Sequence, residues 1–185
     1  MILIAGLGNP GKDYELTRHN IGFSIADKFT EGFEKKSFYR KFDSLICESS
    51  FNNQKLIILK PQTFMNNSGI SIALYYRFFG NQIDSLLVIH DDIDIEFGEI
   101  RLKRGGSTGG HKGLESIVES LGNCNFDRLR FGIGRPPGKQ DPADFVLEEF
   151  KKKEKEEVEA GMQKSVDIIK DYLTEGIKFA MNKYN

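Results

Sequence analysis

The sequence contains no tryptophan and only two cysteines, Cys47 and Cys124, in 185 residues. The two cysteines stand 77 positions apart, which fits neither a zinc site nor a redox pair. We therefore expect two buried thiols in a reducing cytoplasm and no structural metal.

Long hydrophobic runs are also missing. No aliphatic run exceeds five residues, whereas a membrane-spanning helix needs about 20 apolar residues. Met1 leads directly into apolar residues 2–5 and a Gly-Asn-Pro-Gly turn, without the basic segment that opens a secretory signal peptide. These features predict a cytoplasmic protein without a membrane partner.

Charge of one sign is not in excess over the whole chain, whose net charge is −1. The distribution is uneven, because residues 101–139 hold eight Lys or Arg against three Asp or Glu, while residues 1–100 and 141–185 are both acidic. A basic middle between acidic ends predicts one anion-binding face rather than general affinity for nucleic acid.

The hydrophobic residues suffice for one core, with 15 Phe, 6 Tyr and a hydrophobic share of 39%. Short apolar runs that end at turn residues alternate with segments whose apolar residues recur every three or four positions. The pattern predicts a single α/β domain over residues 1–185 with a mixed sheet. Strands are expected at 2–7, 45–51, 55–59, 85–89, 100–103 and 129–133, and helices at 20–32, 61–80, 111–122 and 151–176 with a short terminal helix after Gly176. In the second helix, Ile70, Leu74 and Phe78 are expected to face the core.

Residues 6–11, Gly-Leu-Gly-Asn-Pro-Gly, formally match the G-x-G-x-x-G motif of dinucleotide-binding folds. In those folds the helix begins inside the motif, so that its N-terminus meets the pyrophosphate. Here the helical pattern starts only near His19, and Asp27 falls in mid-helix rather than after a second strand. The segment therefore predicts a turn and no nucleotide site.

His19 and Asp91 stand where a catalytic pair would be expected. His19 lies at a loop-to-helix junction, and Asp91 at the carboxyl end of the most apolar strand, where ligand sites of α/β sheets gather. An imidazole whose tautomer is fixed by a partner can accept a proton at neutral pH. Residue type alone equally allows His19 to cap a helix.

The segment that contains Asp91 is rich in acids. In an extended chain Asp92, Asp94 and Glu96 would share one face and could attract a divalent cation. No histidine stands at ligand spacing, and Gly98 closes the segment, so a solvated edge is the favoured interpretation.

Several polar segments allow both a structural and a functional interpretation. Asn9 and Asn66 stand in turn-like settings, but each can offer an amide donor to a carbonyl or a developing oxyanion. Phe64 is either a core residue or a support for a planar substrate group. Residues 103–113 combine glycines with cations ahead of a helix, which suits a phosphate, although they lack the ending of a nucleotide-hydrolysing loop.

Six collinear segments resemble bacterial peptidyl-tRNA hydrolase. They are GLGNPG (6–11) with Tyr14, TRHNIG (17–22), KPQTFMNNSG (60–69), HDDID (90–94), GGHKGL (109–114) and RLRFGIG (128–134). Six motifs in order over residues 1–135 are far more specific than any one of them.

The resemblance implies an enzyme that cleaves the ester between a peptide, or an N-blocked amino acid, and the 3′-terminal ribose of tRNA, and so recycles tRNA from prematurely released chains. It implies that His19 is the general base that activates water and that Asp91 orients it. No serine stands in a G-x-S-x-G elbow, which favours direct attack of water over an acyl-enzyme. Asn9 would distinguish blocked from free aminoacyl groups.

The resemblance also implies the surroundings of this pair. The family is a monomer built on a twisted mixed β-sheet with helices on both faces, without metal, nucleotide or other cofactor. The remaining site residues are Tyr14, Phe64, Asn66 and Lys112 in the substrate cleft, and Lys103, Arg104 and Arg130 as contacts to tRNA phosphate.

Lys112 departs from the family, which usually has asparagine at this position. We expect the lysine to contact either a tRNA phosphate or, like the asparagine, the peptide or ribose end. Two other functions stay open, a non-catalytic RNA-binding domain that uses residues 101–139 and a metal hydrolase built on the acidic segment. The first is disfavoured if His19 and Asp91 meet within hydrogen-bond reach in one cleft, and the second if turnover survives a chelator.

Overall fold

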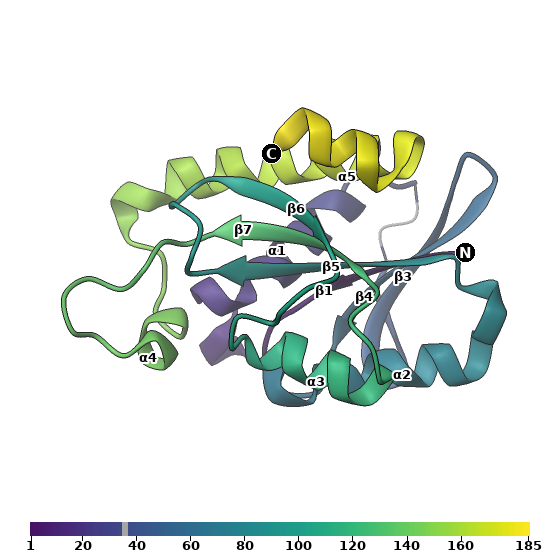
Figure 1. Cartoon of the computed structure of the whole chain (residues 1–185), viewed down its shortest axis with the longest axis horizontal. Helices are drawn as coiled ribbons and strands as arrows, with labels where there is room; N and C mark the ends of the chain where they lie inside the picture. The colour runs from purple at the N-terminus through teal and green to yellow at the C-terminus, as the bar shows by residue number, and fades with distance from the viewer. Residues whose placement is uncertain (35–36) are drawn as a thin grey trace.

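One mixed β-sheet organises the molecule. The computed structural model describes residues 1–34 and 37–185, and within them seven strands are ordered β2-β3-β4-β1-β5-β7-β6 (Figure 1). The four central strands β4, β1, β5 and β7 are parallel, whereas β3 and β6 run antiparallel to their neighbours and β2 antiparallel to β3. The strands are β1 (Ile2–Gly6), β2 (Tyr39–Lys41), β3 (Ser44–Phe51), β4 (Gln54–Pro61), β5 (Ser85–Asp92), β6 (Ile100–Arg104) and β7 (Asp127–Gly132).

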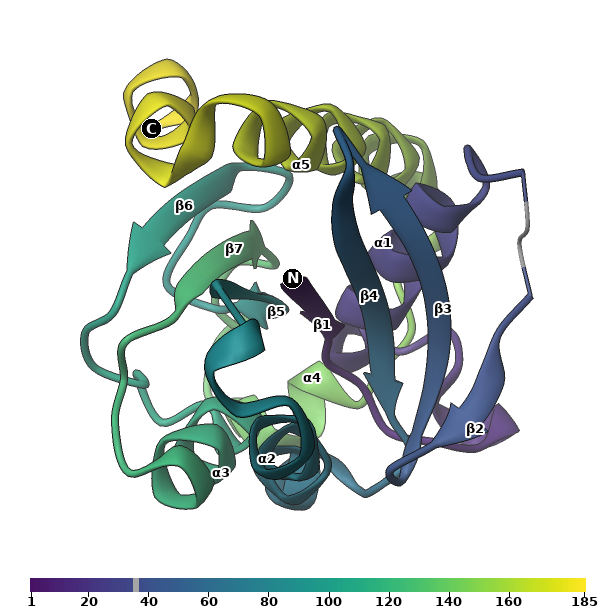
Figure 2. The ribbon, with the colours of Figure 1, turned by 90° about the vertical axis from the view of Figure 1, so that its right-hand side faces the viewer.

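Helices cover both faces of the sheet, which confirms the expected fold class. α1 and α5 pack on one face, and α2 and α3 lie side by side on the other (Figure 2). The α-helices are α1 (Ile21–Thr30), α2 (Ser68–Phe79), α3 (Lys112–Leu121), α4 (Pro142–Val146) and α5 (Lys155–Tyr184), and the short 3-10 helices are η1 (Lys12–Tyr14), η2 (Arg18–Asn20), η3 (Met65–Asn67), η4 (Gly80–Gln82) and η5 (Lys152–Glu154). β2 and α4 are additions to the elements expected from the sequence.

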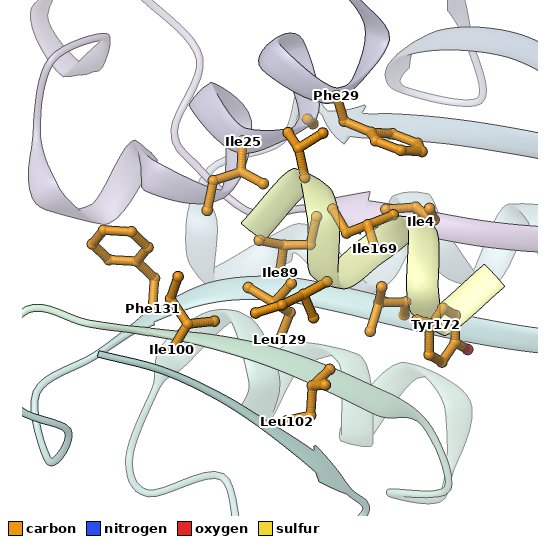
Figure 3. Packing of buried hydrophobic residues seen from close by; sticks show 14 of the residues in the cluster. Ile4, Ile25, Phe29, Ile89, Ile100, Leu102, Leu129, Phe131, Ile169 and Tyr172 are labelled. Carbon is orange, nitrogen blue, oxygen red and sulfur yellow. The ribbon is translucent and has the colours of Figure 1, made fainter. Parts of the chain in front are cut away.

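The apolar run of β1 supplies both cores. Ile2 and Ile4 pack with α1 and α5, while Leu3 and Ala5 pack with α2 and α3, because successive strand residues point to opposite faces. Figure 3 shows the first core, in which Ile4 lies among residues of α1, β5, β7 and α5. A strand covered on both faces reads as a continuous apolar run, and this is why its sequence shows no alternation.

The glycines near the N-terminus serve close packing. A Cβ at Gly6 would lie 2.3 Å from the carbonyl oxygen of Gly22, and one at Gly22 would lie 2.4 Å from the carbonyl oxygen of Ile89. α1 therefore rests directly on the backbone of β1 and β5. Because α1 begins only at Ile21, as the sequence indicated, the preceding turn η2 brings His19 to the carboxyl ends of these strands.

The prediction that Ile70, Leu74 and Phe78 of α2 face the core is wrong. Ile70 and Phe78 are 50% and 64% exposed, and Leu74 is only half-buried. The buried face consists mainly of small residues, because α3 crosses so closely that a Cβ at Gly69 would lie 2.0 Å from the carbonyl oxygen of Ser116. Hydrophobic periodicity does not reveal a contact that requires small side chains.

The two cysteines differ in their burial. Cys47 is buried, as predicted, but Cys124 is only half-buried because it lies in the loop before β7.

The long helix α5 is broken at Gly176 (φ 82°), as expected. In the described part of the chain, no helix combines the length and apolar character needed to cross a membrane.

Candidate active site

The fold brings His19 and Asp91 together from segments 72 residues apart. Nδ1 of His19 donates to Oδ1 of Asp91 over 2.8 Å. The Asp91 side chain is 2% exposed and the His19 side chain 11% exposed, so the imidazole retains an opening to solvent. The hydrogen bond at Nδ1 leaves the second ring nitrogen, Nε2, as the basic position.

His111 is a second imidazole on the same carboxylate, and no pattern in the sequence marks it as a site residue. Its Nε2 lies 3.1 Å from Oδ1 of Asp91, while its Nδ1 accepts the backbone N–H groups of Gly113 (3.1 Å) and Leu114 (3.4 Å). Because Nδ1 is an acceptor, the ring proton is on Nε2 and is donated to Asp91. His111 thus caps the N-terminus of α3 and orients the carboxylate.

The environment sets the charges of this cluster. Burial raises the pKa of the Asp91 carboxyl, but the adjacent His19 and His111 outweigh it, so the pKa lies well below its usual value. His90, which is fully buried, packs edge-on against His111 with ring centroids 4.9 Å apart. Burial, reinforced by His111, lowers the pKa of His90 well below 6.5. Asp91 is therefore ionised and His90 neutral at pH 7. His90 donates a hydrogen bond to the backbone carbonyl oxygen of Asp91, whereas His19 and His111 contact its carboxylate.

His19, Asp91 and His111 offer ligand atoms within 4.8 Å of one another, and they are the one such trio among the described residues. A metal on Nε2 of His111 would require the lone pair at that nitrogen and would move the proton to Nδ1. There the proton would face the N–H groups of Gly113 and Leu114. The donor set therefore fits a metal poorly, because binding would disrupt the cap of α3.

The acidic segment does not form the extended face considered from the sequence. The chain turns directly after β5, at residues 93–95, so the alternation ends there. Asp92 instead accepts a hydrogen bond from Nε of Arg130 (2.9 Å), and Asp94 pairs with Arg135.

A cavity of about 320 Å³ opens beside His19 and Asp91. Its lining residues come from the carboxyl end of β5, from β7 and from α4, whose positions Figure 1 shows. Its lining includes four cations and the glycine loop 107–110, three carboxylates besides Asp91, and several apolar residues. The cations are Lys103, Lys112, Arg128 and Arg130, which together with the loop we call the cationic wall; the carboxylates are Asp92, Asp94 and Asp141. The apolar residues are Ile93 and Leu114, with Pro142, Ala143 and Val146 of α4, which we call the apolar wall.

Arg128, which no pattern in the sequence marks as a site residue, supports the glycine loop. Its buried guanidinium donates to the carbonyl oxygens of Ser107 (2.7 Å) and Gly106 (2.6 Å), and burial lowers its pKa. A buried arginine that serves only backbone carbonyls is recognisable from tertiary structure, not from sequence.

The predicted anion-binding face is smaller than the basic segment. Lys103, Lys112 and Arg130 line the cavity, and their roles in binding substrate or phosphate stay predictions. Arg104 does not line the cavity. It follows Lys103 on β6, and successive strand residues point to opposite faces, so its side chain lies on the other face of the sheet. There Arg104 makes two hydrogen bonds with Asp127, of 2.8 and 3.1 Å.

Asn9 is buried and firmly oriented. Its Oδ1 accepts the backbone N–H of Met65 (2.7 Å), which leaves the Nδ2 group as a donor. Its backbone N–H and C=O both pair with the side-chain amide of Asn20, the residue after His19. Asn9 therefore links the His19 turn to the segment that carries Phe64 and Asn66.

The other substrate candidates are at the surface. Phe64 is 55% exposed, so its interpretation as a core residue is wrong, and its ring meets that of Tyr14 edge-on at 6.4 Å. Asn66 is exposed on η3. Lys112 is exposed as well, and its Nζ lies 3.0 Å from Oε2 of Glu115, which offsets the cost of a cation in the first turn of α3.

The family model described as peptidyl-tRNA hydrolase matches residues 3–185 of this chain. The chain is 42% identical over 182 residues to the peptidyl-tRNA hydrolase of Nocardia farcinica, with 98% of this chain and 94% of that protein covered. It is 43% identical over 185 residues to that of Rhodopirellula baltica, with coverages of 100% and 97%. The chain belongs to the peptidyl-tRNA hydrolase family.

The solved structures agree with this assignment. A crystal structure of peptidyl-tRNA hydrolase from Acinetobacter baumannii is similar with a TM-score of 0.91 at 33% identity, covering 100% of this chain and 94% of that one. Membership of the peptidyl-tRNA hydrolase family makes the chain a hydrolase, which removes the non-catalytic RNA-binding domain from consideration.

Proposed function

We propose that this chain hydrolyses the ester between a peptide, or an N-blocked amino acid, and the 3′ ribose of tRNA, with His19 as the general base. The observation that carries the proposal is the hydrogen bond from Nδ1 of His19 to Asp91 at the edge of the cavity. It fixes the tautomer in which Nε2 has a free lone pair. The second bond to Asp91, from His111, holds the carboxylate in place.

The reaction follows from this arrangement. A water oxygen attacks the ester carbonyl carbon while Nε2 of His19 takes the water proton, and the Asp91 carboxylate stabilises the imidazolium that forms. When the tetrahedral intermediate collapses, the bond from carbon to the 3′ oxygen breaks and Nε2 returns the proton to that oxygen. The products are a peptide carboxylate, with its proton released to solvent, and a tRNA with a free 3′ hydroxyl. General-base assistance of this kind contributes about 10²–10⁴-fold.

Asn9 supplies the selection for blocked substrates. Because its Oδ1 is used by Met65, Nδ2 is presented as a donor. A donor matches the carbonyl of a peptide or acetyl group and offers nothing to the ammonium of a free aminoacyl group. Asn66 is a further amide donor for the peptide or the oxyanion, and Tyr14 with Phe64 supports the substrate end.

Lys103 and Arg130, on the cationic wall, contact tRNA phosphate. Arg104 does not line the cavity and is left out of this role. The enzyme acts in the cytoplasm, where its substrate arises, as a single-domain monomer.

The test compares N-acetylated aminoacyl-tRNA with its unblocked counterpart. The wild type should cleave only the blocked ester, and His19→Ala should lose about 10²–10⁴-fold in turnover while keeping tRNA affinity and Tm. Asp91→Asn should be milder, since an amide still orients the ring but does not stabilise its charged form. Arg101→Ala is the matched control, because Arg101 is exposed and paired with Glu99 outside the cavity. Near-normal turnover by His19→Ala would refute the mechanism.

The alternative function, a metal-dependent hydrolase, is tested with the same substrate. Turnover should survive exhaustive chelation, because the trio on Asp91 fits a metal poorly. Loss of turnover that Mn²⁺ or Zn²⁺ restores, with tRNA folding unchanged, would show that the cluster holds a catalytic metal.

A further inference from the structure

The residue before His19 is a buried arginine. The Arg18 side chain is 1% exposed, although it carries a charge. Its Nη1 donates to the backbone carbonyl oxygens of Glu148 (3.2 Å) and Glu149 (2.6 Å), and its Nη2 to a carboxylate oxygen of Glu154 (3.0 Å). All three partners belong to one segment more than 120 residues away in the sequence.

The same segment also packs on the faces of the guanidinium. Its central carbon lies 4.4 Å from the ring centroid of Phe145 and 5.2 Å from that of Phe150. The backbone N–H of Arg18 donates to Glu148, and Thr17 forms a β-bridge with Glu149. Residues 145–154 are therefore folded around a single side chain of the His19 turn.

This contact supports the apolar wall of the cavity. Pro142, Ala143 and Val146, which line it, belong to α4, a helix of five residues. So short a helix is not stable alone, and its one buried residue is Phe145, the ring that rests on Arg18. The guanidinium is therefore one of the contacts that hold the wall in place, beside the packing of Phe145 and Val146 on the core.

The chemistry of this contact is specific to arginine. Only a planar guanidinium presents several donors in one plane and two faces for aromatic rings. A lysine would reach one acceptor at a time and would leave the other carbonyl groups, or Glu154, without a donor.

We infer that Arg18 is a positioning residue. It holds the segment 141–150, which contains the apolar wall, against the turn η2 that carries His19, and so sets the affinity for the acyl part of the substrate. This role rests on the proposed function. The Arg18 side chain contacts neither Asp91 nor His111 in the bonds described above, so the proton-transfer cluster should persist when the wall loosens. The expected signature is a rise in KM with kcat retained.

The experiment uses Arg18→Lys and two changes on the wall side, Glu154→Gln and Phe150→Leu, with Arg101→Lys as the matched control for an exposed ion pair. Amide hydrogen exchange over residues 141–154 reports the wall without reference to activity. Kinetics with N-acetylphenylalanyl-tRNA report its function. Exchange over 141–154 should accelerate in Arg18→Lys, with α1 and β5 unchanged. KM should rise about tenfold, equivalent to about 1.4 kcal/mol of binding free energy, and kcat should stay within about twofold.

The outcomes separate the inference from the function on which it rests. Unchanged exchange over 141–154, or a fall in kcat at constant KM, would overturn the role of Arg18. If Arg18→Lys does not fold, Glu154→Gln and Phe150→Leu decide the same question, since they leave the His19 turn untouched. Failure of the wild type to cleave the substrate would refute the proposed function, whereas the exchange result would still decide whether Arg18 holds the wall.

Discussion

His111 has two separable tasks, and two substitutions distinguish them. Its Nδ1 caps α3 and its Nε2 holds Asp91. His111→Ala removes both. His111→Asn keeps the cap, because asparagine is among the best residues at this position, but its side chain is too short to reach the carboxylate.

The magnitudes follow from the two contacts. Loss of a cap costs about 1 kcal/mol of unfolding free energy, and loss of a hydrogen bond to a buried charge costs about 1.5–3 kcal/mol. His111→Ala should lose the sum and His111→Asn only the second part, so the two variants should differ by about 1 kcal/mol. Both should lower kcat to the same extent, by about tenfold for about 1.4 kcal/mol of lost transition-state stabilisation, because both release Asp91.

Urea unfolding at pH 7 and single-turnover hydrolysis of N-acetylated aminoacyl-tRNA measure the two effects. Equal destabilisation by the two variants would show that the His111 ring is not the cap. An unchanged kcat in His111→Asn would show that the contact between His111 and Asp91 is not needed for catalysis.

Three further predictions concern other parts of the chain. Below pH 6.5 the unfolded chain protonates His90, while the folded protein does not. Between pH 6 and 5 the wild type should therefore lose up to about 1.4 kcal/mol of unfolding free energy per pH unit more than His90→Phe. An equal fall of the unfolding free energy with pH in both proteins, measured by urea unfolding, would contradict this. Lys112→Ala should weaken tRNA binding and reduce the slope of log K against log salt by about 0.7–0.9, with kcat unchanged. A lower kcat with an unchanged slope would instead place the ammonium of Lys112 at the peptide or the ribose. Gly69→Ala should destabilise by about 1–3 kcal/mol or more, because its Cβ would meet the carbonyl oxygen of Ser116 at 2.0 Å, while Gly32→Ala, whose Cβ would have an ordinary contact at 3.8 Å, should not. Equal urea midpoints for the two glycine variants would contradict that assignment.

The sequence by itself determined the elements whose environment is uniform along the chain. β1 and β5 are covered on both faces, so continuous apolar runs identified them. The late start of α1 was visible in its periodicity and excluded a nucleotide site at residues 6–11. The position of Asp91 at the end of an apolar strand marked the carboxyl edge of the sheet, where the cavity lies.

Only the tertiary structure decided which side chains meet. The contacts of His111 and Arg18 join segments far apart in the chain, and a sequence does not display the orientation of a ring or a guanidinium. Arg104 is absent from the expected phosphate face because its side chain points to the other face of the sheet from Lys103 and bonds to Asp127 there. α2 likewise buries the face that fits closely against α3, and it leaves Ile70 and Phe78 exposed. Local patterns indicate where an element lies along the chain, whereas the face that it buries and the side chains that it meets depend on partners that the local sequence does not contain.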